Sequence, residues 1–437
     1  MLLIMYHRNN LVIPKGKAII LKTTLFFLIV LVFTTSILQA QSTTLQEENG
    51  VTEGENGVKR PLIDSSKERD MSDVYFRLIQ KNKNFTKTRE EDFHKTHFAL
   101  VPAAGYTLQT GFAAILSANW GFSLDTVALQ KVSSITTSFT YSQYNQSIIP
   151  FVANIWTKGN KLNIISDNRY IQYPSEVWGL AGRTDPNQGY TINFSGLKLH
   201  ETIMKEVSKN IFLGIGYYYD QFWKIRALDS VKQNVIRRLT TKVGTSELAS
   251  GMVFRFLYDS RINQIYPEQG WHIDVNYRAN STLLGSDQNW QIVQTDIRTY
   301  SHFPAKSRNI LSFWNFNWFT LGPTSPPYLM MPSTGWDDQY NTGRGYIQGR
   351  YRGRSMYYFE SEYRFRLSRN GLLGAVAFAN AQYFPNEIAT RKDIMVPGFG
   401  GGIRLRLNKH SNANLCLDYG IGLNGSQGFF VNLGEVF

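Results

Sequence analysis

From His97 to the C-terminus, apolar and polar residues alternate in segments of about ten residues, which turn-forming residues separate. This period of two is typical of β-strands, because successive side chains point to opposite faces of a sheet. In the clearest segment, 357–367, one face carries Tyr357, Phe359, Tyr363, Phe365 and Leu367, and the other carries Glu360, Glu362, Arg364 and Arg366. A dry core would lose several kcal/mol for each unpaired ion. The pattern therefore favours a barrel with lipid outside and a wet interior over a soluble sandwich.

Candidate strands begin near residues 97, 110, 132, 147, 161, 190, 210, 249, 270, 288, 308, 354, 371, 398, 412 and 427. Each strand with its connection then takes about 21 residues, which fits tilted membrane strands of about ten residues. The sequence thus predicts an all-β fold, a transmembrane antiparallel β-barrel of sixteen strands over residues 97–437. The long connection between Phe319 and Arg354 is rich in Pro, Gly and aromatic residues, and loops of this length are usually functional or disordered.

The first forty residues are typical of a secretory signal peptide. Basic residues precede the run from Leu25 to Phe33, and Ala40 offers a small residue for cleavage. A membrane anchor is the alternative, but this run is far shorter than the ~20 residues that a spanning helix needs. Residues 41–96 are polar and predict a flexible periplasmic segment, with one possible short helix at Met71–Lys81.

Composition narrows the function classes. Aromatic residues make up 14% of the chain and charged residues 18%, and the mean hydropathy of −0.27 excludes a bundle of membrane helices. The net charge of +13 comes without a basic block or nucleic-acid motif, so we expect no nucleic-acid partner. The single cysteine, Cys416, can form no internal disulfide, and no catalytic motif or metal spacing is present. We therefore expect no enzyme activity, no catalytic or metal-binding residues and no cofactor. The glycines of Gly420-x-Gly422-x-x-Gly425 open no helix and do not indicate a dinucleotide site.

The long connection contains Arg344-Gly345-Tyr346. In this feature the chain resembles the BamA/TamA-like superfamily of outer-membrane assembly and translocation barrels. The resemblance implies that the sixth extracellular loop folds into the barrel and that Arg344 contacts acidic inner-wall residues. The matching wall positions are Glu362 and Asn380. At the position of Asn380, many members have Asp. Because an Arg–amide bond is weaker than an Arg–carboxylate pair, we expect the latch to depend mainly on Arg344 and Glu362. The alternative is that Arg344 is a solvated loop residue.

Two further features carry the resemblance. Asp259 and Arg261, followed by Pro267 and Gly270, match a mid-barrel hairpin of the family, where Pro fixes φ and Gly opens the turn. The C-terminal segment is amphipathic and is expected to form the last strand, with its aromatic terminus resembling the signal read by insertion machinery; its marked residues are Phe429, Leu433, Gly434 and Phe437.

A barrel closes by pairing its first and last strands. Pro102 lacks an N–H and Gly105 weakens a strand, so we expect a thin seam between residues 98–107 and 427–437. The resemblance implies that this seam opens to insert or translocate other proteins in the outer membrane of a Gram-negative bacterium. Outer-membrane lipid, client outer-membrane proteins and periplasmic accessory proteins are the expected partners. Known members carry periplasmic repeat domains that this chain lacks, which leaves two alternatives: a passive or accessory channel, and a lipid-hydrolysing barrel for which no Ser/His pair is identifiable.

Overall fold

The computed structural model describes the ranges 68–71, 73–74, 97–124, 133–180, 184–228, 246–261, 263–337, 340–385, 395–409 and 412–437. The expected signal peptide lies outside these residues. Only the start of the expected Met71–Lys81 helix is described, and Met71, Asp73 and Val74 are helical. None of the helices in the described ranges is long and apolar enough to cross a membrane.

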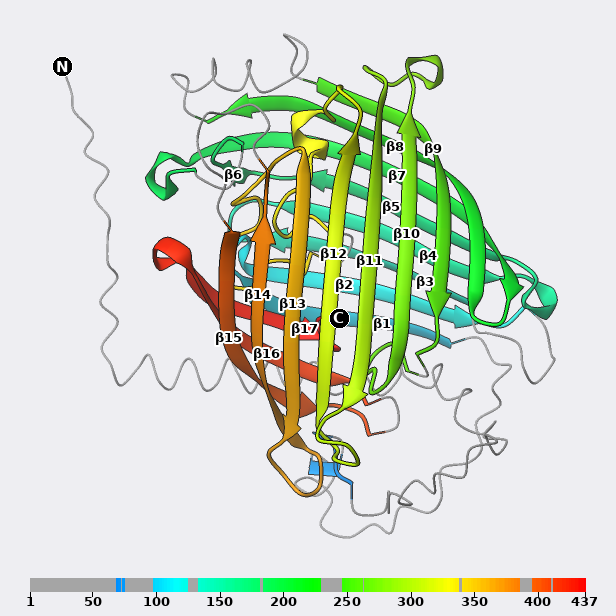
Figure 1. Cartoon of the computed structure of the whole chain (residues 1–437), viewed down its shortest axis with the longest axis vertical. Helices are drawn as coiled ribbons and strands as arrows, with labels where there is room; N and C mark the ends of the chain where they lie inside the picture. The colour runs from blue at the N-terminus through cyan, green and yellow to red at the C-terminus, as the bar shows by residue number, and fades with distance from the viewer. Residues whose placement is uncertain are drawn as a thin grey trace.

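The described residues form seventeen strands, which belong to one sheet (Figure 1). Their bounds are β1 His97–Thr107, β2 Gly111–Phe122, β3 Ser133–Ser142, β4 Ser147–Trp156, β5 Asn163–Gln172, β6 Ser175–Val177, β7 Tyr190–Ser208, β8 Ile211–Ala227, β9 Ser246–Asp259, β10 Gly270–Asn280, β11 Trp290–His302, β12 Ile310–Leu321, β13 Ser355–Arg366, β14 Leu373–Tyr383, β15 Met395–Arg406, β16 Asn414–Gly422 and β17 Gln427–Leu433. Short 3-10 helices lie at Lys158–Asn160, Pro186–Gln188, Thr282–Leu284, Tyr328–Met330 and Leu423–Gly425.

The strands form a nearly closed antiparallel barrel, and it has sixteen strand positions around its wall, as the sequence predicts. We call each of these positions a stave. Each long strand pairs with the next along the chain, and β5 and β6 pair with successive parts of β7, so that these two strands make one stave. We call the end that carries residues 322–354 the loop end. The opposite end, with the short connections 260–269, 303–309, 367–372 and 407–413, is the turn end. Strand β7 of 19 residues and β8 of 17 residues are longer than expected, and a bulge near each end of their ladder accommodates the extra length.

The outer face of the wall is apolar, as the alternation predicts. Trp271, Tyr357, Phe359 and Ile403 are all exposed on it. They belong to a ring of exposed aromatic and aliphatic side chains that extends around the barrel, from Phe98 and Leu100 on β1 to Phe429 and Leu433 on β17. Such a surface suits hydrocarbon rather than water.

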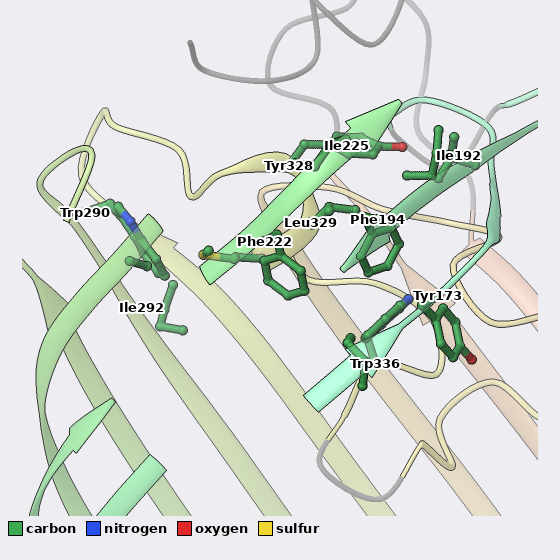
Figure 2. Packing of buried hydrophobic residues seen from close by; sticks show 14 residues of the cluster. Tyr173, Ile192, Phe194, Phe222, Ile225, Trp290, Ile292, Tyr328, Leu329 and Trp336 are labelled. Atoms are coloured by element: carbon green, nitrogen blue, oxygen red, sulfur yellow. The ribbon is translucent and has the colours of Figure 1, made fainter. Parts of the chain in front are cut away.

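The interior is more densely filled than the wet interior that the strand alternation predicts. At the loop end, inward side chains of β7 and β8, including Phe194 and Phe222, pack in an apolar cluster with Tyr328, Leu329 and Trp336 of the long connection (Figure 2). A second apolar cluster gathers Trp314 and Tyr358 from the wall, Tyr346 from the connection and Phe437 from the C-terminus. The connection and the tail therefore fill space that the strand pattern alone assigns to water.

Candidate functional site: the inserted loop, the tail and the seam

Residues 322–354, which we call the inserted loop, are anchored to the wall at the loop end. The carboxylate of Glu247 on β9 accepts hydrogen bonds from the backbone N–H groups of Tyr328 (3.1 Å) and Leu329 (3.2 Å). Arg352 donates to the Tyr328 carbonyl at 2.6 Å. Farther along the loop, the hydroxyl of Thr334 donates to Gln382 on β14 at 2.7 Å. These contacts hold the loop inside the barrel and aim its Arg344 segment toward β13 and β16.

Arg344 is the centre of the inserted loop's contact with the wall. Its side chain is only 2% exposed, and its guanidinium forms ion pairs with Glu360 and Glu362 of β13 and with Asp418 of β16, the last at 2.6 Å. The ring of Phe378 lies 3.7 Å from the guanidinium carbon, in cation–π geometry. Three carboxylates from two strands thus converge on one cation, and Arg344 is not a solvated loop residue.

The structure brings Glu362 to Arg344, as the resemblance implies, but Asn380 has a different part. Its amide donates to the backbone carbonyl of Arg344 at 2.9 Å and does not contact the guanidinium. The expectation of a weak Arg–amide bond is therefore wrong, because the neutral side chain supports the loop backbone. Glu360 and Asp418 were missed in the sequence. Glu360 was visible on the ionic face of its strand, yet nothing in the alternation ranks it as a partner of Arg344.

Glycines on the wall allow the loop backbone to approach closely. A Cβ on Gly420 would lie 2.6 Å from the Gly345 nitrogen, and one on Gly422 would collide with the ring of Tyr346. Gly345 itself has φ +107, and a Cβ there would lie 3.0 Å from the backbone of Ile421. The Gly420-x-Gly422 spacing is therefore a docking strip for the loop tripeptide. This pattern was the available sequence signal for β16.

The last strand ends earlier than predicted. β17 stops at Leu433, Gly434 has φ +83, and Phe437 turns into the barrel, where its side chain is 3% exposed. The Phe437 ring lies 5.3 Å from the ring of Trp314. The terminal aromatic residue is therefore not the end of a lipid-facing strand, because the left-handed glycine redirects the chain. Phe429 and Leu433 remain exposed on the outer face.

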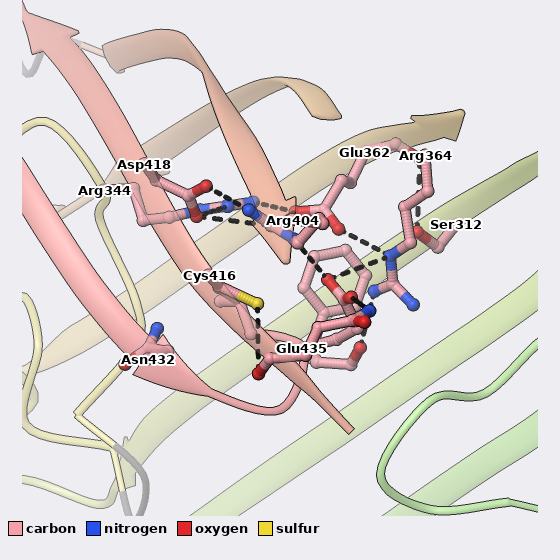
Figure 3. Close-up of polar contacts among 12 residues, drawn as sticks. Ser312, Arg344, Glu362, Arg364, Arg404, Cys416, Asp418, Asn432 and Glu435 are labelled. Atoms are coloured by element: carbon pink, nitrogen blue, oxygen red, sulfur yellow. Dashed lines mark hydrogen bonds and ion pairs between the residues drawn. The ribbon is translucent and has the colours of Figure 1, made fainter. Parts of the chain in front are cut away.

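Ion pairs hold this inward tail against the wall (Figure 3). Glu435 accepts hydrogen bonds from Arg404 on β15 and from Asn414 on β16, each at 2.8 Å. Arg364 on β13 donates to Glu362 at 2.6 Å and to the C-terminal backbone oxygen of Phe437 at 2.7 Å. A continuous network thus joins the loop cation to the tail through the inner wall. The tail also meets the loop directly, where Asn341 donates to the Val436 carbonyl at 2.8 Å.

The predicted hairpin motif lies at the turn end between β9 and β10. Arg261 donates to both carboxylate oxygens of Asp259, at 2.9 and 2.7 Å. Gly270 has φ +108, so a larger residue would be strained there. The carbonyl of Pro267 lies 3.4 Å from Arg364, which links the hairpin to the tail network. The four motif residues therefore support one turn at the turn end, on the turn-end side of Arg344.

The seam between β1 and β17 is the weakest join in the barrel wall. Every other pair of neighbouring strands in the wall is joined by an antiparallel ladder, whereas no ladder joins β1 to β17 among the strands that the structure describes. The two meet near the loop end, where Leu108 packs against Gly428. Pro102 is exposed, and a Cβ on Gly105 would meet nothing within 4 Å. The predicted seam residues therefore lie at an edge with few neighbours.

The site is built to hold structure in place. The carboxylates of Glu362, Asp418 and Glu435 are each paired with guanidinium groups. Across the described ranges, no group of three or more His, Cys, Asp or Glu side chains could hold a metal ion. The arrangement is a network of ion pairs on the inner wall, beside a seam where no ladder joins β1 to β17.

Comparison with known proteins supports the fold. No family model matches the chain, and no curated protein matches it. Among solved structures, BamA from Haemophilus ducreyi lacking POTRA domains 1–3 is similar, with a TM-score of 0.50 and 11% identity over 78% of this chain and 68% of that one. CdiB from Acinetobacter baumannii (TM-score 0.51, 13% identity) aligns over 78% of this chain and 60% of its own length. CdiB from Escherichia coli (TM-score 0.53, 8% identity) aligns over 79% and 63%.

The chain thus spans less than two thirds of either CdiB chain. At these identities the likeness concerns the fold. In fold, this chain is a BamA- and CdiB-like β-barrel, which confirms the resemblance first suggested by Arg344-Gly345-Tyr346.

Proposed function

We propose that this chain is an outer-membrane barrel that inserts or translocates client proteins through the seam between β1 and β17. The observation that carries the proposal is that no ladder of backbone hydrogen bonds joins these two described strands, whereas ladders join the other neighbouring strands of the wall. An unpaired strand edge offers backbone N–H and C=O groups to an incoming strand, which is the geometry of β-augmentation.

The lengths of the two strands sharpen the argument. A register that places Gly428 beside Leu108 places Leu433, five residues on, beside Ala103, five residues back. Because the chain turns inward at Gly434, the six residues 97–102 of β1 would have no partner in β17 even in a fully zipped seam. Phe98 and Leu100 of this segment are 67% and 57% exposed. The free edge therefore lies at the turn end, beside an apolar surface.

The inserted loop and tail support the same function. They form a rigid network with β13 to β16, the staves next to β17, so that the wall beside the seam stays ordered when the seam opens. The similarity to BamA and CdiB agrees with an outer-membrane location and with lipid and protein partners. A passive channel is the rival function, but the packing of the loop and tail in the interior favours a plugged barrel.

Depletion of the protein followed by quantitative profiling of outer-membrane proteins tests the proposal. We expect a defined subset of barrels or exported proteins to fall while total phospholipid is unchanged. Single-channel conductance of the purified protein tests the rival, and we expect no large steady pore. An unchanged protein profile together with a stable, high-conductance pore would overturn the proposal in favour of the channel.

A further inference from the structure

A cluster of basic side chains surrounds a carboxylate at the turn end of the barrel. Arg366 and Arg406 donate to the two oxygens of Glu68, each at 2.9 Å, and Arg308 approaches the same carboxylate at 3.8 Å. Glu68 belongs to the segment that the sequence predicts to be flexible, some 300 residues away along the chain. In Figure 1 the short blue ribbon of residues 68–71 and 73–74 lies beside the turn that follows β13.

Neighbouring residues of the same segment are held as well. The backbone N–H of Arg69 donates to the Asn370 carbonyl at 3.0 Å. Asp70, which is buried, accepts from the backbone N–H of Lys409 at 3.0 Å, and Asp73 accepts from the Lys409 ammonium at 3.1 Å. Three acidic residues at positions 68, 70 and 73 thus match four basic residues that come from three turn-end connections and their strands.

The basic cluster has binding capacity beyond its present occupant. Among the described residues, none is a hydrogen-bond partner for the buried Nε atoms of Arg366 and Arg406. Arg406 as a whole is only 3% exposed. Arg308 is half exposed and only distantly engaged. Gly371, with φ +71, leaves the room in which the two guanidiniums lie, since a Cβ there would be 2.9 Å from Arg406. A buried guanidinium with unused donors is suited to a second carboxylate oxygen.

We propose that Arg308, Arg366, Arg406 and Lys409 form a binding site for an acidic polypeptide segment, and that residues 68–73 occupy this site in cis. The identification of such a segment as part of a client or of a periplasmic accessory protein rests on the proposed function. The contacts of the cis segment are hydrogen bonds and ion pairs of its carboxylates and backbone. An acidic segment of another chain offers the same groups, so it can take the place of residues 68–73 by exchange. A tethered occupant competes at an effective concentration of about millimolar, which sets the affinity that a partner must reach.

Binding of a labelled peptide tests the site. The peptide carries residues 64–77 of this chain, and its fluorescence anisotropy is followed with the purified full-length protein in detergent micelles. The control peptide has amides in place of the side-chain carboxylates of Glu68, Asp70 and Asp73. The test variant is Glu68→Gln/Asp70→Asn, which removes two of the three acidic charges of the cis occupant. The matched control is Glu206→Gln, an exposed acid near the turn end of β7.

We expect the acidic peptide to bind the test variant about tenfold more tightly than the wild type or the control, because the competing tethered ligand is weakened. Arg308→Ala and Arg366→Gln in the test-variant background should each reduce the binding severalfold, with folding checked by heat-modifiable gel mobility. Equal binding to all variants, or equal binding of the amide peptide, would overturn the proposal. Displacement by inorganic phosphate as effective as displacement by unlabelled acidic peptide would also overturn it, by showing a general anion site. The peptide assay needs no client protein, so it tests the acidic-segment site independently of the proposed function. The site can be refuted while the depletion experiment supports the proposed function, and the opposite outcome can also occur.

Discussion

Removing the Arg344 guanidinium should destabilise the inserted loop through one carboxylate in particular. In Arg344→Met, Glu362 keeps its pair with Arg364 and Asp418 keeps its pair with Arg404. Glu360 is 0% exposed, and of its partners among the described residues it keeps only the hydroxyl of Tyr358. Breaking a buried ion pair from one side costs about 3–5 kcal/mol, most of it for the charge left behind. We therefore expect the free energy of unfolding to fall by about that amount.

The second half of this prediction is a rescue. If the cost comes from the stranded charge, Glu360→Gln in the Arg344→Met background should recover about half of it, whereas Asp418→Asn in that background should recover little. Urea unfolding in lipid vesicles, followed by tryptophan fluorescence, measures the free energy, and limited proteolysis reports release of the loop. A loss below about 1 kcal/mol for Arg344→Met would show that the network is not stabilising. Equal recovery from both second substitutions would show that Glu360 is not the stranded group.

Three other perturbations follow from the same contacts. Gly345→Ala should destabilise the loop by about 1–3 kcal/mol through its positive φ and its approach to Ile421, whereas Gly425→Ala, also at positive φ but in open space, should leave loop proteolysis unchanged. Asn380→Asp should destabilise the loop by about 1–3 kcal/mol, because a carboxylate cannot donate to the Arg344 carbonyl; a more stable variant would contradict this reading. Burial opposes ionisation of Glu68, but the hydrogen bond from Arg366 and the nearby guanidiniums hold its pKa below the ordinary value of 4.5. Glu68 is ionised at neutral pH in both the folded and the unfolded state, so residues 68–73 should stay docked there. The docking should be lost as the pH falls through the lowered pKa of Glu68. Spin-label distances between residue 67 and the turn after β13 measure the docking, and distances that stay constant down to pH 2 would contradict this prediction.

The wall of the barrel could be predicted from the sequence because its pattern is local. Alternation places Tyr357 and Phe359 outside and Glu360 and Glu362 inside without any knowledge of the neighbouring strands. The loop contact was predictable only in part. Glu362 came from a resemblance, whereas Asp418 depends on which stave faces the loop, and that is a property of the closed barrel.

The interior was harder to predict, because its occupants come from distant parts of the chain. Alternation along a strand determines on which face of the sheet Phe194 lies. It does not determine that Trp336 from the inserted loop packs against Phe194 inside the barrel. The turn at Gly434 is likewise invisible in an amphipathic segment, since an extended glycine fits the same pattern. Glu68 lies in a polar stretch whose composition resembles that of disordered chains, and its partners are specified by three separate turns.

A disulfide lock across the seam tests the central claim most directly. The side chain of Leu108 fills the space that a Cβ at Gly428 would occupy, so cysteines at these two positions face each other across the seam. Cys416→Ser removes the buried native thiol. Cells that depend on the locked protein should show the same loss of outer-membrane clients as depleted cells, while each single-cysteine control restores the full profile. A locked barrel that sustains every client at wild-type levels would contradict the claim that this protein works by opening between its first and last strands.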